Sequence, residues 1–351
     1  MSPSVESIMF VGRLKSGSTS SHRMLSLREL GLRVVAIDTH PEDVRRKERT
    51  FLERVRKKLF GPRDLARANE AMLAAAHRES VDVVWIDRGT TIHGRTLLEL
   101  RGLLPDARIV HYNPDDPFGG FGKGEWRTFL KAVADYHVHL VPREPNVEEY
   151  RAIGARDVRH VVPFWGYSPD DHRPLRVDEH ERRHLGAPVG FIGMAETERA
   201  HTIADLAARG FEVKVWGDGW ERYKRITGGR FVYAGPAQFG EMYAKIINSF
   251  DINLAFLRKA NRDQHTSRSV ELPAAGAFML AERSDEHLTL FDEGREAEFF
   301  DDNDELARKV AHYLAHPNER RSIAARGRAR CSRSGYSNME RMRSMLELVA
   351  H

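Results

Sequence analysis

The chain has 351 residues, of which 41% are hydrophobic and 30% are charged, and its formal net charge is +4. This length predicts two domains of ordinary size, and no apolar run approaches the roughly 20 residues that a membrane-spanning helix needs. Cys331 is the only cysteine, which excludes an internal disulfide and a cysteine metal cluster. The first residues show no basic region followed by an apolar one, so we expect no secretory signal and a cytoplasmic protein.

The first half of the chain alternates between strand-like and helix-like patterns. This alternation is typical of a parallel sheet with helices on both faces. The expected strands are 7–12, 32–38, 81–87, 107–112, 136–141 and 158–162, and the expected helices are 22–30, 64–79 and 94–103.

Basic residues gather in one segment of this half. Residues 1–165 have a net charge of +5, whereas residues 166–351 have a net charge of −1. Much of the excess lies in segment 45–58, where Val44, Phe51, Val55 and Leu59 recur at helical intervals. The pattern predicts an amphipathic surface helix with a solvated basic face. The alternative is a patch that attracts an anionic acceptor, a membrane surface or nucleic acid.

A stretch rich in proline and turn residues, 163–174, interrupts the alternation and predicts the start of a linker. The pattern then restarts with strand, glycine, helix, glycine and strand, as in the first half. The expected strands are 189–193, 211–217, 231–235, 252–256, 277–280 and 298–300, and the expected helices are 200–209, 238–249, 268–275, 304–315 and 317–330.

These patterns predict an α/β protein with two Rossmann-like domains that face each other across a cleft. Ligand is expected at the carboxyl ends of the strands. The predicted parts are an N-terminal domain, a linker, a C-terminal domain and a terminal helix for which packing on the N-terminal domain is one possibility. Their bounds are 1–165, 166–186, 187–330 and 331–351.

The segment with the most chemistry runs from Asp263 to Glu271. Two acids enclose seven residues, among them Thr266, Ser267 and Arg268, and a small-residue stretch follows through Gly276. Carboxylates accept hydrogen bonds from sugar hydroxyls, and an arginine offers a planar fork of donors to phosphate oxygens. The segment therefore indicates binding of a sugar that is attached to a nucleotide.

The C-terminal half resembles the nucleotide-sugar domain of GT-B glycosyltransferases. It is most similar to the CgeB-like (spore-maturation type) enzymes and to the broader retaining group 1 family. The matching stretches, which cover most of residues 189–330 in the expected order, are 191–193 with Arg199, 215–220, 232–235, 251–254, 266–276 and 300–327. The N-terminal half matches more loosely.

The resemblance implies roles for individual residues. Glu271 corresponds to the second acid of the family's Glu-x7-Glu motif, which holds the donor ribose, and Asp263 replaces the first glutamate, which lies near the donor sugar. Arg268 would stabilise the leaving diphosphate beside a helix N-terminus, as basic side chains replace a metal in the family. Further donor-site candidates are Gly193, Arg199, Trp216, Gly217, Gly235, Arg258, Lys259, Thr266 and Ser267.

Two loops of the N-terminal half supply further candidates, one for the donor and one for the acceptor. Gly12, Gly17 and Ser18 lie in a glycine-serine loop after the first strand, which in the resembling fold closes over the donor. Asp115 and Asp116 also follow a strand and could orient or deprotonate an acceptor hydroxyl, with a slight preference for Asp116. Each acid is equally suited to cap a turn. The remaining histidines show no metal-ligand spacing, so no metal site is predicted.

The expected function is metal-independent, retaining transfer of a sugar from a nucleotide diphosphate sugar to an acceptor hydroxyl, with no cofactor. The acceptor is unknown, and an anionic or membrane-associated acceptor, with the enzyme peripheral to the membrane, fits the basic segment. One alternative is a sugar-nucleotide epimerase of the same architecture. Others are a nucleic-acid-associated protein, which is not favoured because no recognised nucleic-acid-binding motif is present, and a catalytically inactive nucleotide-sugar binder.

Overall fold

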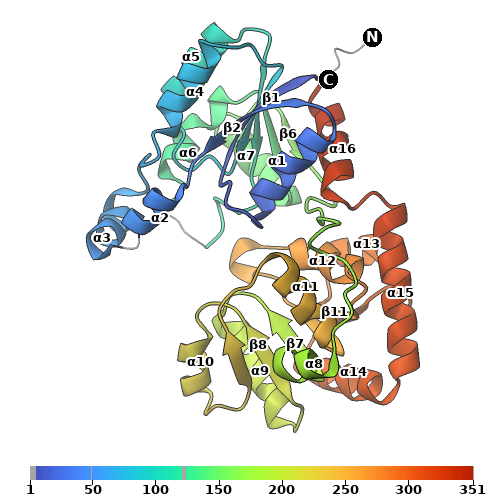
Figure 1. Cartoon of the computed structure of the whole chain (residues 1–351). Coiled ribbons are helices and arrows are strands. Elements are labelled where there is room, and N and C mark those ends of the chain that lie inside the picture. Colours follow the sequence, from blue (N-terminus) through green and yellow to red (C-terminus); the bar gives the residue numbers. More distant parts are fainter. Residues whose placement is uncertain (1–4, 49, 121–123, 351) are drawn as a thin grey trace. The chain divides into compact units, whose positions relative to one another are not determined.

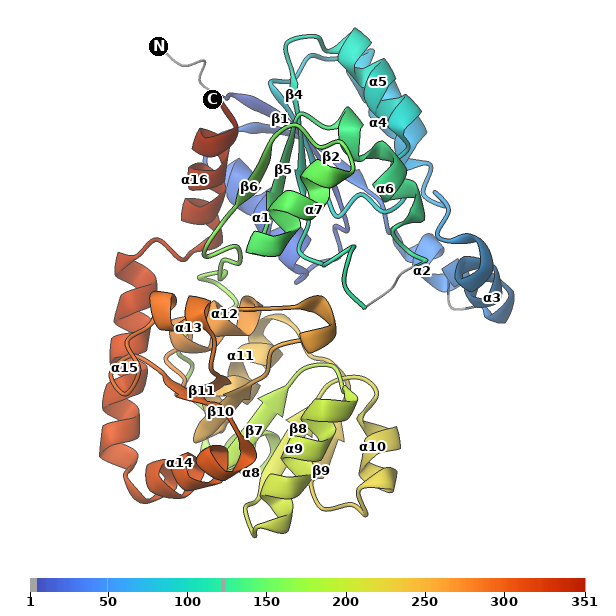
Figure 2. The same cartoon turned by 180° about the vertical axis from the view of Figure 1, so that it is seen from behind.

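The computed structural model describes residues 5–48, 50–120 and 124–350, and it divides into two compact units (Figure 1 and Figure 2). The first unit comprises the chain up to Phe164, the segment Arg258–Asp263 and the C-terminal helix from Asn338. The second unit comprises Trp165–Leu257 and Gln264–Ser337. Each unit contains one sheet with its own core.

The sheet of the first unit is parallel throughout and has the strand order β2-β1-β3-β4-β5-β6. Its strands are β1 (Ser7–Gly12), β2 (Arg33–Asp38), β3 (Val83–Asp87), β4 (Arg108–Tyr112), β5 (Val138–Val141) and β6 (Val158–His160). β1, β3 and β5 are buried along their whole length, which explains why they read as continuous apolar runs. The strand order reverses between β1 and β3, and this point is the expected ligand-binding edge of such a sheet.

Helices surround this sheet on both faces or extend from its edge. They are α1 (Thr19–Glu29), α2 (Glu42–Glu48), α3 (Phe51–Phe60), α4 (Ala68–Ala76), α5 (Gly94–Leu103), α6 (Arg127–Ala132), α7 (Glu144–Ala152) and α16 (Asn338–Ala350), with a 3-10 turn η1 at Val133–Asp135. The C-terminal helix α16 contacts α1 and β4, and α1 and α16 lie side by side in both views.

The sheet of the second unit is also parallel and has the order β12-β11-β10-β7-β8-β9. Its strands are β7 (Val189–Ile192), β8 (Val213–Trp216), β9 (Val232–Gly235), β10 (Ile252–Ala255), β11 (Met279–Glu282) and β12 (Glu298–Phe300). Counted within the unit, this is the Rossmann order 3-2-1-4-5-6, with its reversal between β7 and β10.

The helices of the second unit are α8 (Glu179–Leu185), α9 (Thr197–Ala208), α10 (Trp220–Ile226), α11 (Gly240–Ser249), α12 (Ser267–Ala274), α13 (Asp285–Leu290), α14 (Asn303–Ala315) and α15 (Pro317–Arg333). The 3-10 turn η2 (Lys259–Asn261) lies in the segment that belongs to the first unit. Two Rossmann-like domains are therefore confirmed. None of the helices described here is long and apolar enough to cross a membrane.

Two local predictions need correction. The segment 166–186, predicted as a linker, contains α8, whose Asp178 and Glu181 form a capping box. The single helix predicted over 45–58 is instead two helices, α2 and α3. The side chain of Thr50 caps α3 by accepting from the backbone N–H of Glu53, which explains why a new helix begins there.

Candidate functional site

The best candidate site in the second unit lies at the reversal point of its sheet. The neighbouring strands β7 and β10 end there, at Ile192 and Ala255. The connections that follow these two strands leave in opposite directions. In doubly wound sheets, ligands bind outside the carboxyl ends of the strands at this point. The helix α12, which begins at Ser267, contributes the side chains described next.

Arg268 is fixed at the end of β7. Its Nε donates to the backbone carbonyl of Ile192 at 3.2 Å and its Nη1 donates to Ser267 Oγ at 3.2 Å. The guanidinium lies 5.9 Å from the centre of the Tyr243 ring. The charge therefore stands beside the first turn of α12, where backbone N–H groups and the helix dipole also favour an anion. This arrangement suits a diphosphate.

Glu271 lies one turn further along α12 and is buried. Its carboxylate accepts from the Tyr243 hydroxyl at 2.9 Å, and His172 Nε2 is 3.8 Å away. Burial alone would raise the pKa of Glu271, but His172, Arg268 and the hydrogen bonds from Tyr243 and Ser267 lower it overall. The carboxylate is therefore ionised at neutral pH and able to accept a hydrogen bond from a ribose hydroxyl.

The start of α12 is itself well ordered by hydrogen bonds. The backbone N–H of Thr266 donates to Ser269 Oγ at 3.0 Å, and that hydroxyl is also 2.6 Å from His287 Nε2. Thr266 thus caps the helix with Ser269, whereas the Ser267 hydroxyl contacts Arg268. Tyr243 and His172, which flank Glu271, were missed by the sequence analysis because no short motif connects residues that far apart in the chain.

The predicted glycines at the ends of β7, β8 and β9 pack against one another. The N–H of Gly217 donates to the carbonyl of Gly235 at 2.9 Å, and a Cβ on Gly217, whose φ is +135°, would lie 2.0 Å from the carbonyl oxygen of Gly193. Trp216, also predicted for the donor, donates its indole N–H to the carbonyl of Leu185 at 3.0 Å. These residues therefore shape the strand ends through backbone packing.

Arg199 stabilises the turn after β7. Its guanidinium lies 3.3 Å from Glu196 and donates to the carbonyl of Met194 at 3.3 Å. Its side chain is largely buried and lies above the ring of Phe191. Within the second unit, Arg199 is thus bound to its own loop.

The remaining donor candidates, Arg258, Lys259 and Asp263, belong to the first unit. Asp263 forms an ion pair with Arg143 and accepts from Asn261 Nδ2 at 3.0 Å. The two acids of the Asp-x7-Glu motif therefore belong to different units. The Asp263 carboxylate already has two partners in the first unit, Arg143 and Asn261. These contacts give Asp263 a structural role in that unit in addition to the predicted contact with the donor sugar.

Asp115 and Asp116 differ sharply in environment. Asp116 is buried and accepts from Arg262 Nε at 2.6 Å, Asn146 Nδ2 at 3.0 Å and the backbone N–H of Phe118 at 3.0 Å. Burial would raise its pKa, but these hydrogen bonds lower it overall, which makes Asp116 a weak base. Asp115 is more exposed and contacts Arg88 Nε at 2.8 Å. The geometry thus reverses our preference for Asp116.

A small pocket of about 30 Å³ lies at the reversal point of the first sheet, beside the ends of β1, β2 and β3. It is lined by hydroxyl groups and charged side chains, among them Arg13, Thr39, Lys57, Asp87, Arg88, Thr90, Thr91 and Glu125. Arg88 connects this pocket to Asp115. A polar lining of this kind offers hydrogen-bond partners to a hydroxyl group.

The glycine-serine loop near this pocket has mainly structural contacts. Ser18 caps α1 by accepting from the backbone N–H of Ser21 at 3.2 Å, and its hydroxyl donates to the carbonyl of Arg13 at 3.0 Å. Gly17 has a φ of +74°, and a Cβ on Gly12 would lie 2.4 Å from Ser20 Oγ. The loop is thus held tightly at the end of β1.

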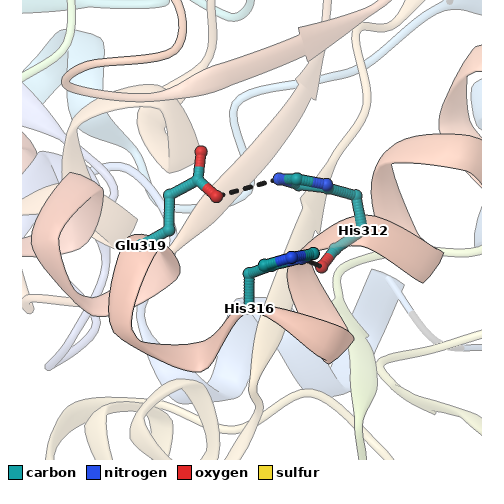
Figure 3. Close-up of side chains that lie close together, drawn as sticks. All are labelled: His312, His316 and Glu319. Carbon is teal, nitrogen blue, oxygen red and sulfur yellow. Dashed lines mark hydrogen bonds and ion pairs between the residues drawn. The ribbon is translucent and has the colours of Figure 1, made fainter.

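Among the residues that the structure describes, one group of side chains could hold a metal ion, and it lies at the junction of α14 and α15. His312, His316 and Glu319 have ligand atoms within 4.8 Å of one another, and all three are exposed (Figure 3). His312 Nε2 is 2.9 Å from the Glu319 carboxylate, so an ordinary surface ion pair accounts for the contact. The i, i+4, i+7 spacing of these three residues places them on one side of the helix junction and is the sequence signal for the group.

Comparisons with known proteins agree with this arrangement. A family model described as "Glycosyl transferase-like" matches residues 198–347, which include α12 with Arg268 and Glu271. Residues 198–347 are therefore similar to glycosyltransferases, and the fold of the chain is of the GT-B type. A search of curated protein sequences found no match.

Solved structures share the fold of this chain over nearly its whole length. Anabaena HepE in complex with UDP and glucose is 12% identical, with a TM-score of 0.62 and coverage of 98% of this chain and 99% of that one. Sucrose-phosphate synthase from Thermosynechococcus elongatus is 14% identical, with a TM-score of 0.65 and 98% coverage of both chains. A putative UDP-N-acetylglucosamine 2-epimerase from Listeria monocytogenes is 12% identical, with a TM-score of 0.53 and coverage of 98% and 95%.

Proposed function

We propose that this protein is a glycosyltransferase that moves a sugar from a nucleotide diphosphate sugar to an acceptor hydroxyl, with Arg268 on the diphosphate and Glu271 on the ribose. The observation that carries the proposal is the position of Arg268, which is bound to the last residue of β7 at the reversal point of the sheet. The complexes of HepE with UDP and UDP-glucose make uridine diphosphate sugars the first donors to test.

Sugar transfer requires the site to stabilise the charge that develops on the leaving group. As the bond to the sugar breaks, negative charge develops on the diphosphate, and a fixed cation in a water-poor site stabilises it. Arg268 and the N–H groups of α12 supply this stabilisation. We propose that transfer proceeds with retention, as the group 1 resemblance implies, and NMR of the anomeric proton of the product would detect inversion.

A thermal-shift panel of nucleotide sugars tests the donor. A ligand at 100 times its dissociation constant stabilises the protein by about 2.7 kcal/mol, so one base and one sugar should raise the melting temperature clearly. The epimerase alternative predicts instead that a nucleotide sugar is converted to its epimer with no acceptor present. The weaker TM-score of the epimerase structure favours transfer.

We expect turnover to continue in excess EDTA. The diphosphate has a guanidinium and helix N–H groups as partners at the proposed site, so a metal ion is not needed to neutralise it. The measurement is release of nucleoside diphosphate with and without chelator. Loss of activity in EDTA that Mg²⁺ or Mn²⁺ restores would contradict the metal-independent mechanism.

We propose that the pocket of the first unit binds the acceptor and that Asp115 orients its hydroxyl. Asp115→Asn should then lower the rate of transfer at least tenfold and leave donor affinity unchanged. Asp116→Asn should act differently, because its buried carboxylate binds Arg262 and Asn146, and should lower the melting temperature. Wild-type kinetics in Asp115→Asn would remove the role proposed for it.

A further inference from the structure

The apolar side of α3 faces solvent. Its large apolar side chains are exposed by 41% to 80%, and they are Phe51, Leu52, Val55, Leu59 and Phe60. A surface helix normally turns its apolar stripe to the core. Contiguous exposed apolar side chains mark a surface that another partner covers. We call these five side chains the α3 patch.

Polar side chains of α3 form hydrogen bonds and ion pairs with the rest of the first unit. Glu53 accepts from Arg56 at 2.8 Å and from Arg63 at 3.2 Å. Lys57 forms an ion pair with Glu125 at 3.3 Å, and Arg56 donates to the carbonyl of Gly61 at 3.0 Å. The outward direction of the α3 patch is therefore set by the polar contacts on the other side. In both views α2 and α3 extend away from the sheet (Figure 1 and Figure 2).

The charge around the α3 patch identifies the kind of partner. Residues 42–63 contain nine Lys+Arg and four Asp+Glu, a net charge of +5. A second copy of the chain would bring an equally positive segment against this one in a twofold contact, so self-association is disfavoured. Exposed Phe and Leu on one helix face with Lys and Arg around them are typical of helices that lie in the headgroup region of an anionic bilayer.

We propose that α3 is a membrane-docking helix whose apolar patch enters the interface of an anionic lipid bilayer. Lys57 of α3 and Val44 of α2 also line the pocket of the first unit. Docking by α3 would therefore hold that pocket near the lipid headgroups, where a membrane-bound acceptor presents its hydroxyls. Only this last step rests on the proposed function, since docking itself needs neither donor nor transfer.

Vesicle sedimentation tests the proposal with the full chain. Wild-type protein should bind vesicles that contain phosphatidylglycerol and bind vesicles of pure phosphatidylcholine more weakly. Leu52→Asp with Leu59→Asp should lower the partition coefficient at least tenfold. The matched control is Leu25→Asp with Leu98→Asp, which changes two exposed leucines of α1 and α5 in the same unit by the same charge. The control should bind like wild type.

Three outcomes would overturn the proposal. One is wild-type protein that does not bind anionic vesicles, and another is equal loss of binding in both double variants. The third is a wild-type dimer in solution that Leu52→Asp with Leu59→Asp converts to a monomer, because a second copy would then cover the α3 patch. Circular dichroism and calorimetric binding of UDP serve as checks. Unchanged UDP binding in the α3 variant separates failure of docking from failure of the proposed donor site.

Discussion

Arg268→Ala is expected to weaken donor binding at least tenfold, or by about 1.4 kcal/mol. The variant removes the guanidinium from the end of β7, together with its contacts to the carbonyl of Ile192 and to Ser267. Glu271→Gln should have a similar effect because a neutral amide accepts a weaker hydrogen bond from ribose than a carboxylate does. Titration calorimetry with a nucleoside diphosphate measures both.

Matched controls lie in the same unit. Arg209→Ala removes an arginine whose partners, Asp205 and Asp304, lie at the surface, and Glu212→Gln changes an exposed glutamate. Both controls should bind donor like wild type. Unchanged affinity in Arg268→Ala and Glu271→Gln would reject the donor site assigned here.

Arg23→Met is expected to destabilise the first unit by about 3–5 kcal/mol. Arg23 and Asp87 are both almost fully buried, and Arg23 donates to Asp87 Oδ2 through Nη2 at 2.5 Å and through Nε at 3.1 Å. Removing the arginine leaves the carboxylate buried without its cation. Denaturant unfolding followed by tryptophan fluorescence measures the loss.

Two further variants show whether burial of the ion pair is the reason for the loss of stability in Arg23→Met. Arg33→Met breaks an exposed ion pair with Glu79 and should cost at most about 1 kcal/mol. Arg23→Met combined with Asp87→Leu removes both charges and should recover part of the stability. Equal destabilisation in Arg23→Met and Arg33→Met would contradict the explanation.

The strands were predictable because buried parallel strands appear in the sequence as short apolar runs. β1 and β12 have the bounds expected from their apolar runs, and the other strands differ by a few residues at their ends. Helices without a clear apolar stripe were missed, such as α10 and α13. The α3 patch could not be foreseen, because a periodic apolar stripe does not say whether it faces the core or the solvent.

The site was predictable only where one helix supplies it. Arg268 and Glu271 lie three residues apart, so helical spacing alone places them together. Tyr243, His172 and Ile192 join them through the tertiary fold and carry no local signal. The environment of Asp116 could not be predicted, because two of its three donors, Asn146 and Arg262, come from distant parts of the chain. These contacts make a candidate base into a buried structural acid.

A crystal structure of the protein with bound UDP tests the central claim most directly. The account predicts diphosphate oxygens within about 3.2 Å of the Arg268 guanidinium, next to the first turn of α12, and a ribose hydroxyl donating to Glu271. Nucleotide bound away from the ends of β7 and β10, with Arg268 and Glu271 making the same contacts as before, would contradict it.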